Sequence, residues 1–223
     1  MAVQVLGISG SPIPESNTDR AVKYILEQTG LETAFLKLSE LDVEPCRACL
    51  GCVRDNRCVV KDDGQTLAEL FHEAPAFVLG AYTPYSSLDA RSKTFMERMY
   101  CFRHRVGAGA GKFGASVITT ACAPDVAGLP PAAETATSQI AFWMMEEGIA
   151  NLGSMVLLGN VPCIRCGYGD DCKMSGVEMI HGSEASVASV GVREFEDDES
   201  LLATARQLAQ KIRESVLGRT GET

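Results

Sequence analysis

The sequence predicts an α/β protein built on a doubly wound, five-stranded parallel sheet. Short apolar runs rich in β-branched residues alternate along the chain with segments whose apolar residues recur at helical spacing. These runs are apolar throughout rather than alternating, as expected of strands that are covered on both faces. The 223 residues, 46% of them hydrophobic, suffice for one domain of ordinary density.

The elements follow one another as strand and helix. The first run, VQVLGI, ends in Ser, Gly and Pro and predicts a central strand, and Gly30 is placed to close the helix that follows. The alternation continues to a final amphipathic helix. We expect strands at 3–8, 33–38, 76–81, 112–120 and 154–158, and helices at 18–28, 64–73, 90–100, 132–151 and 199–216.

Two cysteine-rich segments interrupt this pattern. Residues 1–160 are expected to form the sheet domain, with a cysteine loop at 44–64 after the second strand. Residues 161–198 are expected to form an irregular, cysteine-containing extension, and 199–223 to carry the last helix of the same domain and a tail. A long stretch without periodicity is uncommon unless something organises it.

Composition excludes several classes of function. The net charge is -9 and the 20 Lys and Arg are scattered, so no basic face is offered to nucleic acid or to a membrane surface. The start MAVQVLGISGSP has no basic and apolar leader, and no run is long enough to span a bilayer. We expect a cytoplasmic protein, in which nine cysteines indicate metal or redox chemistry rather than disulfides.

The segment GSPIPESNT joins the first predicted strand to a helix and is rich in hydrogen-bond donors. Its position at the carboxyl end of a parallel strand and at a helix N-terminus favours an anion. The spacing matches neither GxGxxG nor GxxxxGK[ST], so a phosphomonoester such as that of FMN fits better than a dinucleotide or ATP. The alternative is a turn that only caps the helix. The candidate phosphate ligands are Ser9, Ser11, Ser16, Asn17 and Thr18.

The loop after the third predicted strand brings a proline turn, an aromatic ring and several donors to the same crevice. A flavin ring needs a packing surface and hydrogen bonds at its pyrimidine end, which such a loop supplies. The alternative is a proline-stabilised turn with a half-buried tyrosine. The candidate residues are Thr83, Pro84, Tyr85, Ser86 and Ser87.

The segment CRACLGCVRDNRC places Cys46, Cys49, Cys52 and Cys58 on one short loop. A compact CxxCxxC run presents three sulfurs from one winding loop, as [4Fe–4S] clusters require, whereas structural zinc usually takes two separate CxxC knuckles. The cluster is the favoured interpretation, and zinc or unmetallated thiols are the alternatives.

A second group of cysteines, Cys163, Cys166 and Cys172, stands in CIRCGYGDDC. A second cluster on these thiols, with Cys122 from the loop after the fourth strand as fourth ligand, would organise the irregular extension. The alternatives are a zinc site completed by His181 and a reversible disulfide.

Three motifs together, GSPIPESNT, CRACLGCVRDNRCVVKDD and TPYSSLDARSKTFMER, resemble the iron–sulfur flavoproteins, within the larger NADPH-dependent FMN reductase superfamily. The resemblance covers residues 3–160. It implies a flavodoxin-like fold, FMN held by the loops at 9–18 and 83–87, and a [4Fe–4S] cluster on the four cysteines of 46–58. It also implies homodimers or homotetramers in which a cluster reaches a flavin across a subunit contact.

This sequence departs from the family pattern at three places. The loop between Pro84 and Lys93 is shorter than usual, and CIRCGYGDDC is not part of the pattern. TTACAPDVAG stands where the family often has a glycine-rich loop, and there Thr119 and Thr120 are the expected cofactor contacts.

The predicted function is electron transfer, in which a cluster carries single electrons and FMN stores one or two. Ferredoxin or NAD(P)H is the expected electron donor. The alternatives are an NAD(P)H-dependent FMN or quinone reductase, which is also an oxidoreductase, and a zinc-binding flavodoxin-like regulatory or interaction module.

Overall fold

A computed structural model describes residues 2–124, 126 and 128–220, and it confirms the predicted fold class. All neighbouring strands run parallel, in the order β2-β1-β3-β4-β5, which is the flavodoxin order. Every residue of β1 is buried, as predicted for a central strand. The strands are β1 (Val5–Ser9), β2 (Thr33–Lys37), β3 (Ala76–Tyr82), β4 (Phe113–Thr120) and β5 (Ala150–Leu158).

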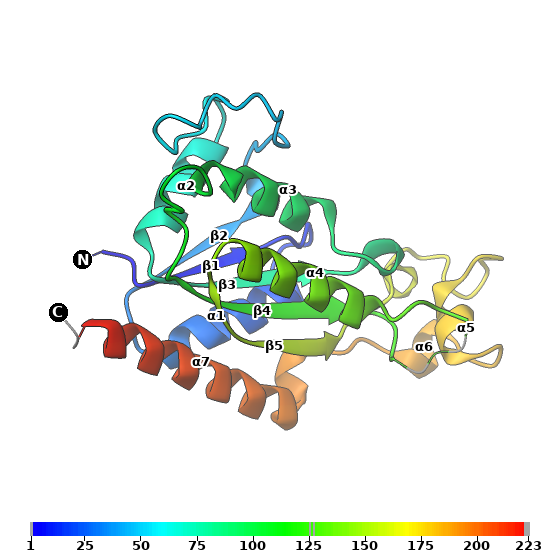
Figure 1. Ribbon diagram of the computed structural model, residues 1–223. Coiled ribbons are helices and arrows are strands. Elements are labelled where there is room, and N and C mark those ends of the chain that lie inside the picture. Colours follow the sequence, from blue (N-terminus) through cyan, green and yellow to red (C-terminus); the bar gives the residue numbers. More distant parts are fainter. Residues whose placement is uncertain (1, 125, 127, 221–223) are drawn as a thin grey trace.

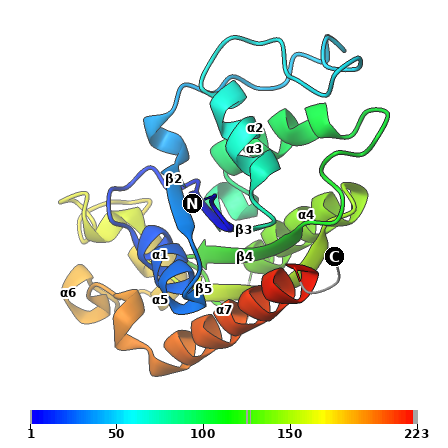
Figure 2. The same cartoon turned by 90° about the vertical axis from the view of Figure 1, so that its left-hand side faces the viewer.

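Helices cover both faces of the sheet (Figures 1 and 2). The side chains of α2, α3 and α4 form one core with one face of the sheet, and those of α1 and α7 form a second core with the other face. The main helices are α1 (Asn17–Thr29), α2 (Gly64–Glu73), α3 (Ala90–Arg98), α4 (Ala132–Glu146) and α7 (Glu199–Thr220). Among the described residues, no helix has the length and apolar character that a membrane crossing demands.

The helix predicted at 132–151 is too long, and the last strand begins earlier than predicted. The helix α4 ends at Glu146, and Gly148 then turns the chain with φ at 68°, a conformation that favours glycine. The strand β5 begins two residues later, at Ala150. Apolar periodicity alone did not separate the end of a buried helix from the start of the next strand.

The extension (161–198) is irregular, as predicted, and contains the short helices α5 (Gly176–His181) and α6 (Val187–Val190). It leaves the sheet where the amide of Gly159 donates to the carbonyl of Thr120, at the carboxyl ends of β5 and β4. In Figure 1 it lies beyond the arrowheads of these strands. The extension therefore covers the edge of the sheet at which ligands of this fold bind.

Candidate functional site

The loop between β1 and α1 rests on a buried charged network. The hydroxyl of Ser9 donates to Oδ1 of Asp19 at 2.6 Å, and Lys37 forms an ion pair with the other oxygen of this carboxylate. Lys37 also donates to the carbonyl of Ile13 at 2.8 Å. Ser16 and Asp19 form a reciprocal capping box at the start of α1. The lysine offsets the charge of Asp19, so the loop can receive an anion without facing an uncompensated carboxylate.

Several groups of this loop keep donors for a ligand. Ser11 and Ser16 accept hydrogen bonds from the amides of Ile13 and Asp19 through their hydroxyl oxygens, so each O–H remains able to donate. The first-turn amides of α1, at Asn17 and Thr18, have no intrahelical acceptor. Neutral hydrogen-bond donors at a helix N-terminus can bind a phosphate group, and this set of donors fits the phosphate of FMN.

The side chains of Asn17 and Thr18 are used within the protein. Asn17 donates to the carbonyl of Arg193 at 2.8 Å and accepts from the amide of Phe195. The hydroxyls of Thr18 and Thr119 lie 2.7 Å apart, which joins α1 to the end of β4. Their direct binding of the cofactor through side chains stays a prediction.

Thr120 is also engaged within its own loop. Its Oγ1 accepts from the amide of Cys122 at 3.3 Å and donates to the carbonyl of the same residue at 3.4 Å. The first residues after β4 are therefore folded back on the strand end, at the same edge of the sheet as α1. Burial raises the pKa of the Cys122 thiol.

The loop after β3, from Thr83 to Ser87, presents an unsupported aromatic ring. The Tyr85 side chain is fully exposed, at 103%. Tyr85 and Ser86 both adopt positive φ, 51° and 56°, which is uncommon outside glycine and is frequent at binding sites. The following Ser87 and Leu88 are held to Gln139 of α4. An exposed ring on an anchored turn provides a surface on which a flat cofactor can pack.

The loops after β1 and β3 touch at Gly10. A Cβ added to Gly10 would lie 2.3 Å from Oγ of Ser92 and 2.7 Å from Oδ1 of Asp89. Asp89 is fully buried, caps α3 through the amide of Ser92 at 2.9 Å, and accepts from the amide of Tyr82. Burial raises the pKa of Asp89. Only glycine allows the two loops to approach this closely, so Gly10 fixes the shape of the crevice.

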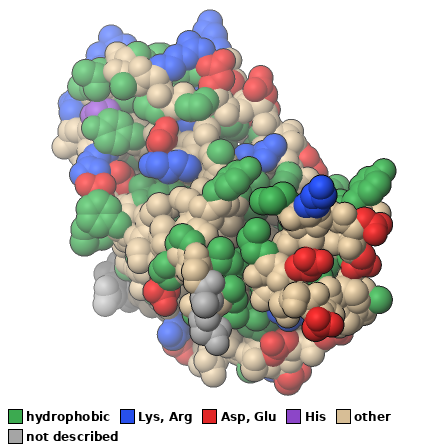
Figure 3. All heavy atoms as spheres, turned by 90° about the vertical axis from the view of Figure 1, so that its right-hand side faces the viewer, with side chains coloured by type: hydrophobic (Ala, Val, Ile, Leu, Met, Phe, Trp, Pro, Cys, Tyr) green, Lys and Arg blue, Asp and Glu red, His purple; other side chains and the backbone are tan. Residues whose placement is uncertain are grey.

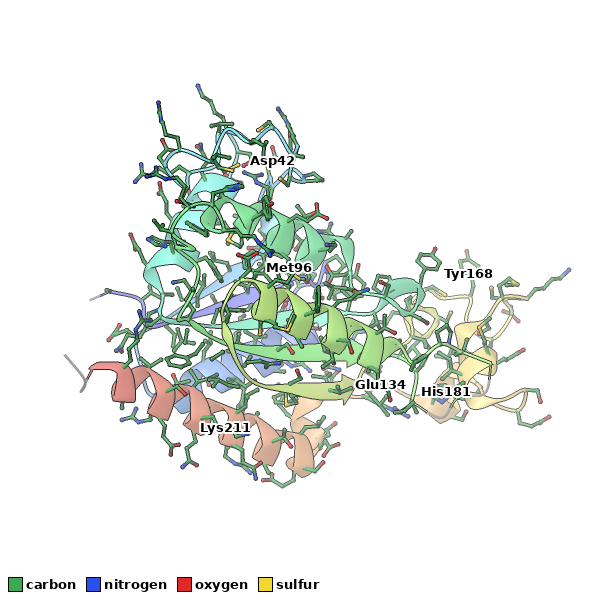
Figure 4. The ribbon with its side chains drawn as sticks, in the orientation of Figure 1. Asp42, Met96, Glu134, Tyr168, His181 and Lys211 are labelled. Atoms are coloured by element: carbon green, nitrogen blue, oxygen red, sulfur yellow. The ribbon has the colours of Figure 1, made fainter. Side chains whose placement is uncertain are left out.

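The first cysteine loop (44–64) carries its four thiols without regular secondary structure, and Figure 4 shows it from Asp42 onward at the top of the molecule. Cys46 and Cys49 are exposed, and Cys52 and Cys58 are half-buried. Burial raises the pKa of Cys52, and the negative charges of the other three thiolates add to this effect. Cys52 and Cys58 also pack against the core that α2, α3 and α4 form.

A buried arginine holds the end of this loop. Arg98, at the C-terminal end of α3, is 2% exposed and binds both carboxylate oxygens of Asp62, at 2.5 and 2.8 Å. It also donates to the carbonyl of Glu44 at 2.9 Å and to Sγ of Cys58 at 3.4 Å. A Cβ on Gly64 would collide with the guanidinium. Arg98 thus fastens both ends of the loop to α3.

A cavity of about 440 Å³ lies between the first cysteine loop and α2, and Cys58 and Cys101 both line it. Cys101 is 3% exposed, and burial together with the charges of Cys58 and Cys52 raises the pKa of its thiol to about 12. Asn56 closes the wall by donating to the carbonyls of Cys101 and His104. The cysteine that the sequence left unassigned therefore lies against the first cysteine loop.

Each thiol of the second cysteine group accepts a hydrogen bond from a backbone amide. The amide of Gly176 donates to Sγ of Cys163 at 3.3 Å. Cys166 and Cys172 accept from the amides two residues after them, each at 3.4 Å. Such N–H···S bonds stabilise thiolates and are a means by which proteins tune metal–sulfur centres.

All nine cysteines are unpaired thiols. In the part of the chain that the structure describes, no three His, Cys, Asp or Glu side chains converge closely enough to hold a metal ion. The donor chemistry of the first cysteine loop fits an iron–sulfur cluster, with four free thiols on one irregular loop. The assignment of individual ligands stays a prediction, and a cluster would have to draw the loop together.

The sequence did not point to Asp19, Lys37, Asp62, Arg98 or Cys101. The S-x-x-D spacing of Ser16 and Asp19 is a capping-box signal that was available. The ion pairs of Lys37 and Arg98 join residues 18 and 36 positions apart, so no local pattern indicates them.

Comparison with known proteins gives a consistent relationship. The profile of the NADPH-dependent FMN reductase family matches residues 3–145. The chain is 33% identical over 123 residues to an iron–sulfur flavoprotein of Methanocaldococcus jannaschii, covering 51% of this chain and 63% of the relative. It is 29% identical over 118 residues to an iron–sulfur flavoprotein of Methanosarcina thermophila, covering 52% and 62%. The resemblance to iron–sulfur flavoproteins is thus confirmed, over less than two thirds of each relative's length.

Solved structures share the fold across nearly the whole chain. The Trp repressor binding protein from Bacillus subtilis superposes with a TM-score of 0.59 at 14% identity, covering 92% of this chain and 99% of that one. A flavodoxin from the domain Archaea gives a TM-score of 0.51 at 14% identity, covering 96% and 99%. At such low identity these similarities establish the fold alone.

Proposed function

Because the chain belongs to the NADPH-dependent FMN reductase family, we propose that it binds FMN and transfers electrons between this flavin and a [4Fe–4S] cluster on the first cysteine loop. The observation that carries the proposal is the presence of four free thiols on one short loop beside a flavodoxin-type sheet. When bound, the flavin would supply one- and two-electron chemistry and the cluster one-electron chemistry.

The protein's own part in this function is to bind and position the two groups. The hydroxyls of Ser11 and Ser16 and the first-turn amides of α1 would hold the FMN phosphate. The turn at Tyr85 would support the ring, and Gly10 keeps the two binding loops in contact. At the other site, Arg98 holds Cys58 in place and offsets the negative charge of a thiolate cluster.

The separate positions of the first cysteine loop and the candidate flavin crevice favour a homodimer or homotetramer. The first cysteine loop lies at the upper left of Figure 1, over α2 and the C-terminal end of α3, whereas the carboxyl ends of the strands point to the right. Segments that are separated in one view are separated in space. A second subunit that brought its crevice to this loop would shorten the path, in agreement with the subunit contact that the family resemblance implies.

Lys and Arg side chains are prominent at the top of Figure 3, where the first cysteine loop lies. This loop carries Arg47, Arg54, Arg57 and Lys61, and its acidic residues Glu44, Asp55, Asp62 and Asp63 balance their charge. The choice of donor therefore rests on chemistry: a cluster accepts one electron at a time, and ferredoxin, a one-electron carrier, is the donor that we propose.

The test begins with anaerobically purified protein. Its visible spectrum, FMN, iron, acid-labile sulfide and zinc contents should show flavin together with iron and sulfide. Cys49→Ser should lose iron while FMN stays bound, because the predicted flavin contacts lie on other loops. Zinc in place of iron would refute the electron-transfer proposal and favour the zinc-binding module.

Ser11→Ala should weaken FMN binding about fivefold or more, because it removes a donor contribution of about 1 kcal/mol. Thr18→Ala should weaken it too, because it breaks the hydroxyl contact with Thr119 that holds the start of α1 against the end of β4. Titration of apoprotein measures the dissociation constant, and Ser200→Ala on α7 is the matched control. Unchanged FMN affinity in both variants would contradict the phosphate-loop assignment.

A second candidate, an NAD(P)H-dependent FMN or quinone reductase, is favoured by the family itself. Bleaching of the flavin by NAD(P)H alone would support it, whereas bleaching by reduced ferredoxin and not by NAD(P)H would support electron transfer.

A further inference from the structure

The second cysteine group lies on the side of the molecule where the flavin is expected. The extension follows β5 directly and returns to α1, where the carbonyl of Arg193 accepts from both Asn17 and Asn160. Figure 1 shows the extension beyond the arrowheads of β4 and β5, away from the first cysteine loop. The two cysteine-rich segments thus belong to different sites, and the second shares an edge of the sheet with the candidate phosphate loop.

The backbone around the second cysteine group is shaped to point amides at sulfur. Gly167 follows Cys166 with φ at 82°, and the next amide, that of Tyr168, donates to Sγ of Cys166. A CxxCG turn with this hydrogen bond has the backbone conformation of a metal-binding CxxC turn, because the left-handed glycine directs the next amide toward the cysteine sulfur. Cys172 repeats the bond, with the amide of Met174 as donor.

Buried contacts fix the ends of this loop. A Cβ on Gly169 would lie 2.5 Å from the carbonyl oxygen of Cys163, so the chain crosses itself there with no room for a side chain. The buried hydroxyl of Ser175 donates to the carbonyl of Gly169 at 2.6 Å. The amide of Val187 donates to Asp170, which ties the loop to α6. These contacts hold three thiols on one short, closed loop.

We propose that Cys163, Cys166 and Cys172 bind a second thiolate-ligated metal centre, an iron–sulfur cluster, at the flavin edge of the same chain. The proposal rests on the proposed electron-transfer function and adds a centre to it. Within the described residues, the three sulfurs do not converge on one point. The site is therefore not preformed, and metal binding would draw the loop together, as it does in other small metal sites where binding and folding are coupled.

Ligand chemistry favours Cys122 over His181 as the fourth ligand, because iron–sulfur clusters are held mainly by cysteine thiolates. Cys122 follows β4 by two residues, and Cys163 follows the paired Gly159 by four. The paired strands β4 and β5 therefore deliver both thiols to the same edge of the sheet, and Cys122 is the cysteine that we propose as the fourth ligand.

The test compares metal content in three forms of the anaerobically purified protein. The native protein should contain about eight irons and eight sulfides per FMN, if both clusters are cubanes. Cys166→Ser should lose about half of the iron, and Cys49→Ser should lose the complementary half. Alkylation of native protein, with peptide mapping before and after metal removal, checks the same point without a variant: cysteines 163, 166 and 172 should be protected until the metal is removed.

The outcomes separate this inference from the proposed function. Four irons per FMN that Cys49→Ser removes and Cys166→Ser does not would overturn the second centre and leave the first intact. Zinc that disappears in Cys166→Ser would overturn the iron–sulfur assignment. Alkylation of the three thiols in native protein, or a disulfide among them, would overturn metal binding altogether. Absence of iron from all forms would overturn both proposals.

Discussion

Arg98 offers the sharpest test of how the first cysteine loop is held. The Arg98 side chain is 1% exposed and the Asp62 side chain 5%, so the ion pair is buried. Arg98→Met keeps most of the side-chain volume but leaves Asp62 buried without its cation. Removing one partner of a buried ion pair costs about 3–5 kcal/mol. Asp62 keeps hydrogen bonds from the amides of Glu44 and Gly64, both at 2.9 Å, which places the expected loss near the lower limit.

Urea denaturation followed by circular dichroism measures this loss as a change in unfolding free energy. Arg206→Met is the matched control, because the side chain of Arg206 is 42% exposed and that of its ion-pair partner Glu199 is 78% exposed. Such a surface pair contributes about 0–1 kcal/mol. Equal effects of the two substitutions, or a loss below about 1 kcal/mol in Arg98→Met, would refute the clamp. Iron content should also fall in Arg98→Met, since Cys58 loses a donor to its sulfur.

The pH dependence gives the same prediction a second check. The hydrogen bonds from Arg98 hold the pKa of Asp62 below its ordinary value. A carboxyl whose folded pKa is depressed stabilises the fold above the unfolded pKa of about 3.9, and this contribution is lost as pH falls through the folded value. The stability gap between wild type and Arg98→Met should therefore be full at pH 7 and narrow below about pH 4. A gap that does not change with acidification would contradict the ion-pair explanation.

Two further substitutions probe the crevice and the amino edge of the sheet. Gly10→Ala places a methyl group 2.3 Å from Oγ of Ser92; it should cost about 1–3 kcal/mol of stability and weaken FMN binding in an apoprotein titration, whereas Gly218→Ala, in open space on α7, should do neither. Lys112 donates to two backbone carbonyls at 2.6 and 2.9 Å, so Lys112→Met should lose about 1–3 kcal/mol at pH 7 in urea denaturation. Burial lowers the pKa of Lys112 from 10.5 to about 8. Between pH 8 and pH 10.5 the unfolded chain therefore binds more protons than the folded protein, and the unfolding free energy of the wild type should rise as the pH increases. The same rise in Lys112→Met would contradict this assignment.

The sequence was sufficient for the fold because the signals that define it are local. Continuous apolar runs indicated buried parallel strands, and their alternation with helices indicated a doubly wound sheet. The boundary between α4 and β5 was misplaced because the residues on both sides of Gly148 are apolar, and a left-handed turn leaves no mark in hydrophobic periodicity. The spacing of the cysteines was likewise a local signal, and it indicated the two cysteine-rich segments.

The clamps around these segments were not predictable in the same way. Arg98 stands on a helix of strongly amphipathic character, where a charged residue is ordinarily solvated. Only the return of the first cysteine loop onto the end of α3 makes it a buried partner of Asp62. Cys101 is a similar case, since its nearness to Cys58 follows from the path of the chain after α3.

Asn17 shows how a local motif can acquire a different use in three dimensions. By position it belongs to the predicted phosphate loop, but its side-chain nitrogen donates to Arg193 and its oxygen accepts from Phe195 and Arg20. Its backbone amide is still a first-turn donor of α1. One residue therefore joins α1, the helix of the candidate phosphate loop, to the cysteine-bearing extension. Ordering of the extension by a metal would reach the phosphate loop through this contact, and FMN binding would in turn favour the ordered extension, because coupling between two sites is reciprocal.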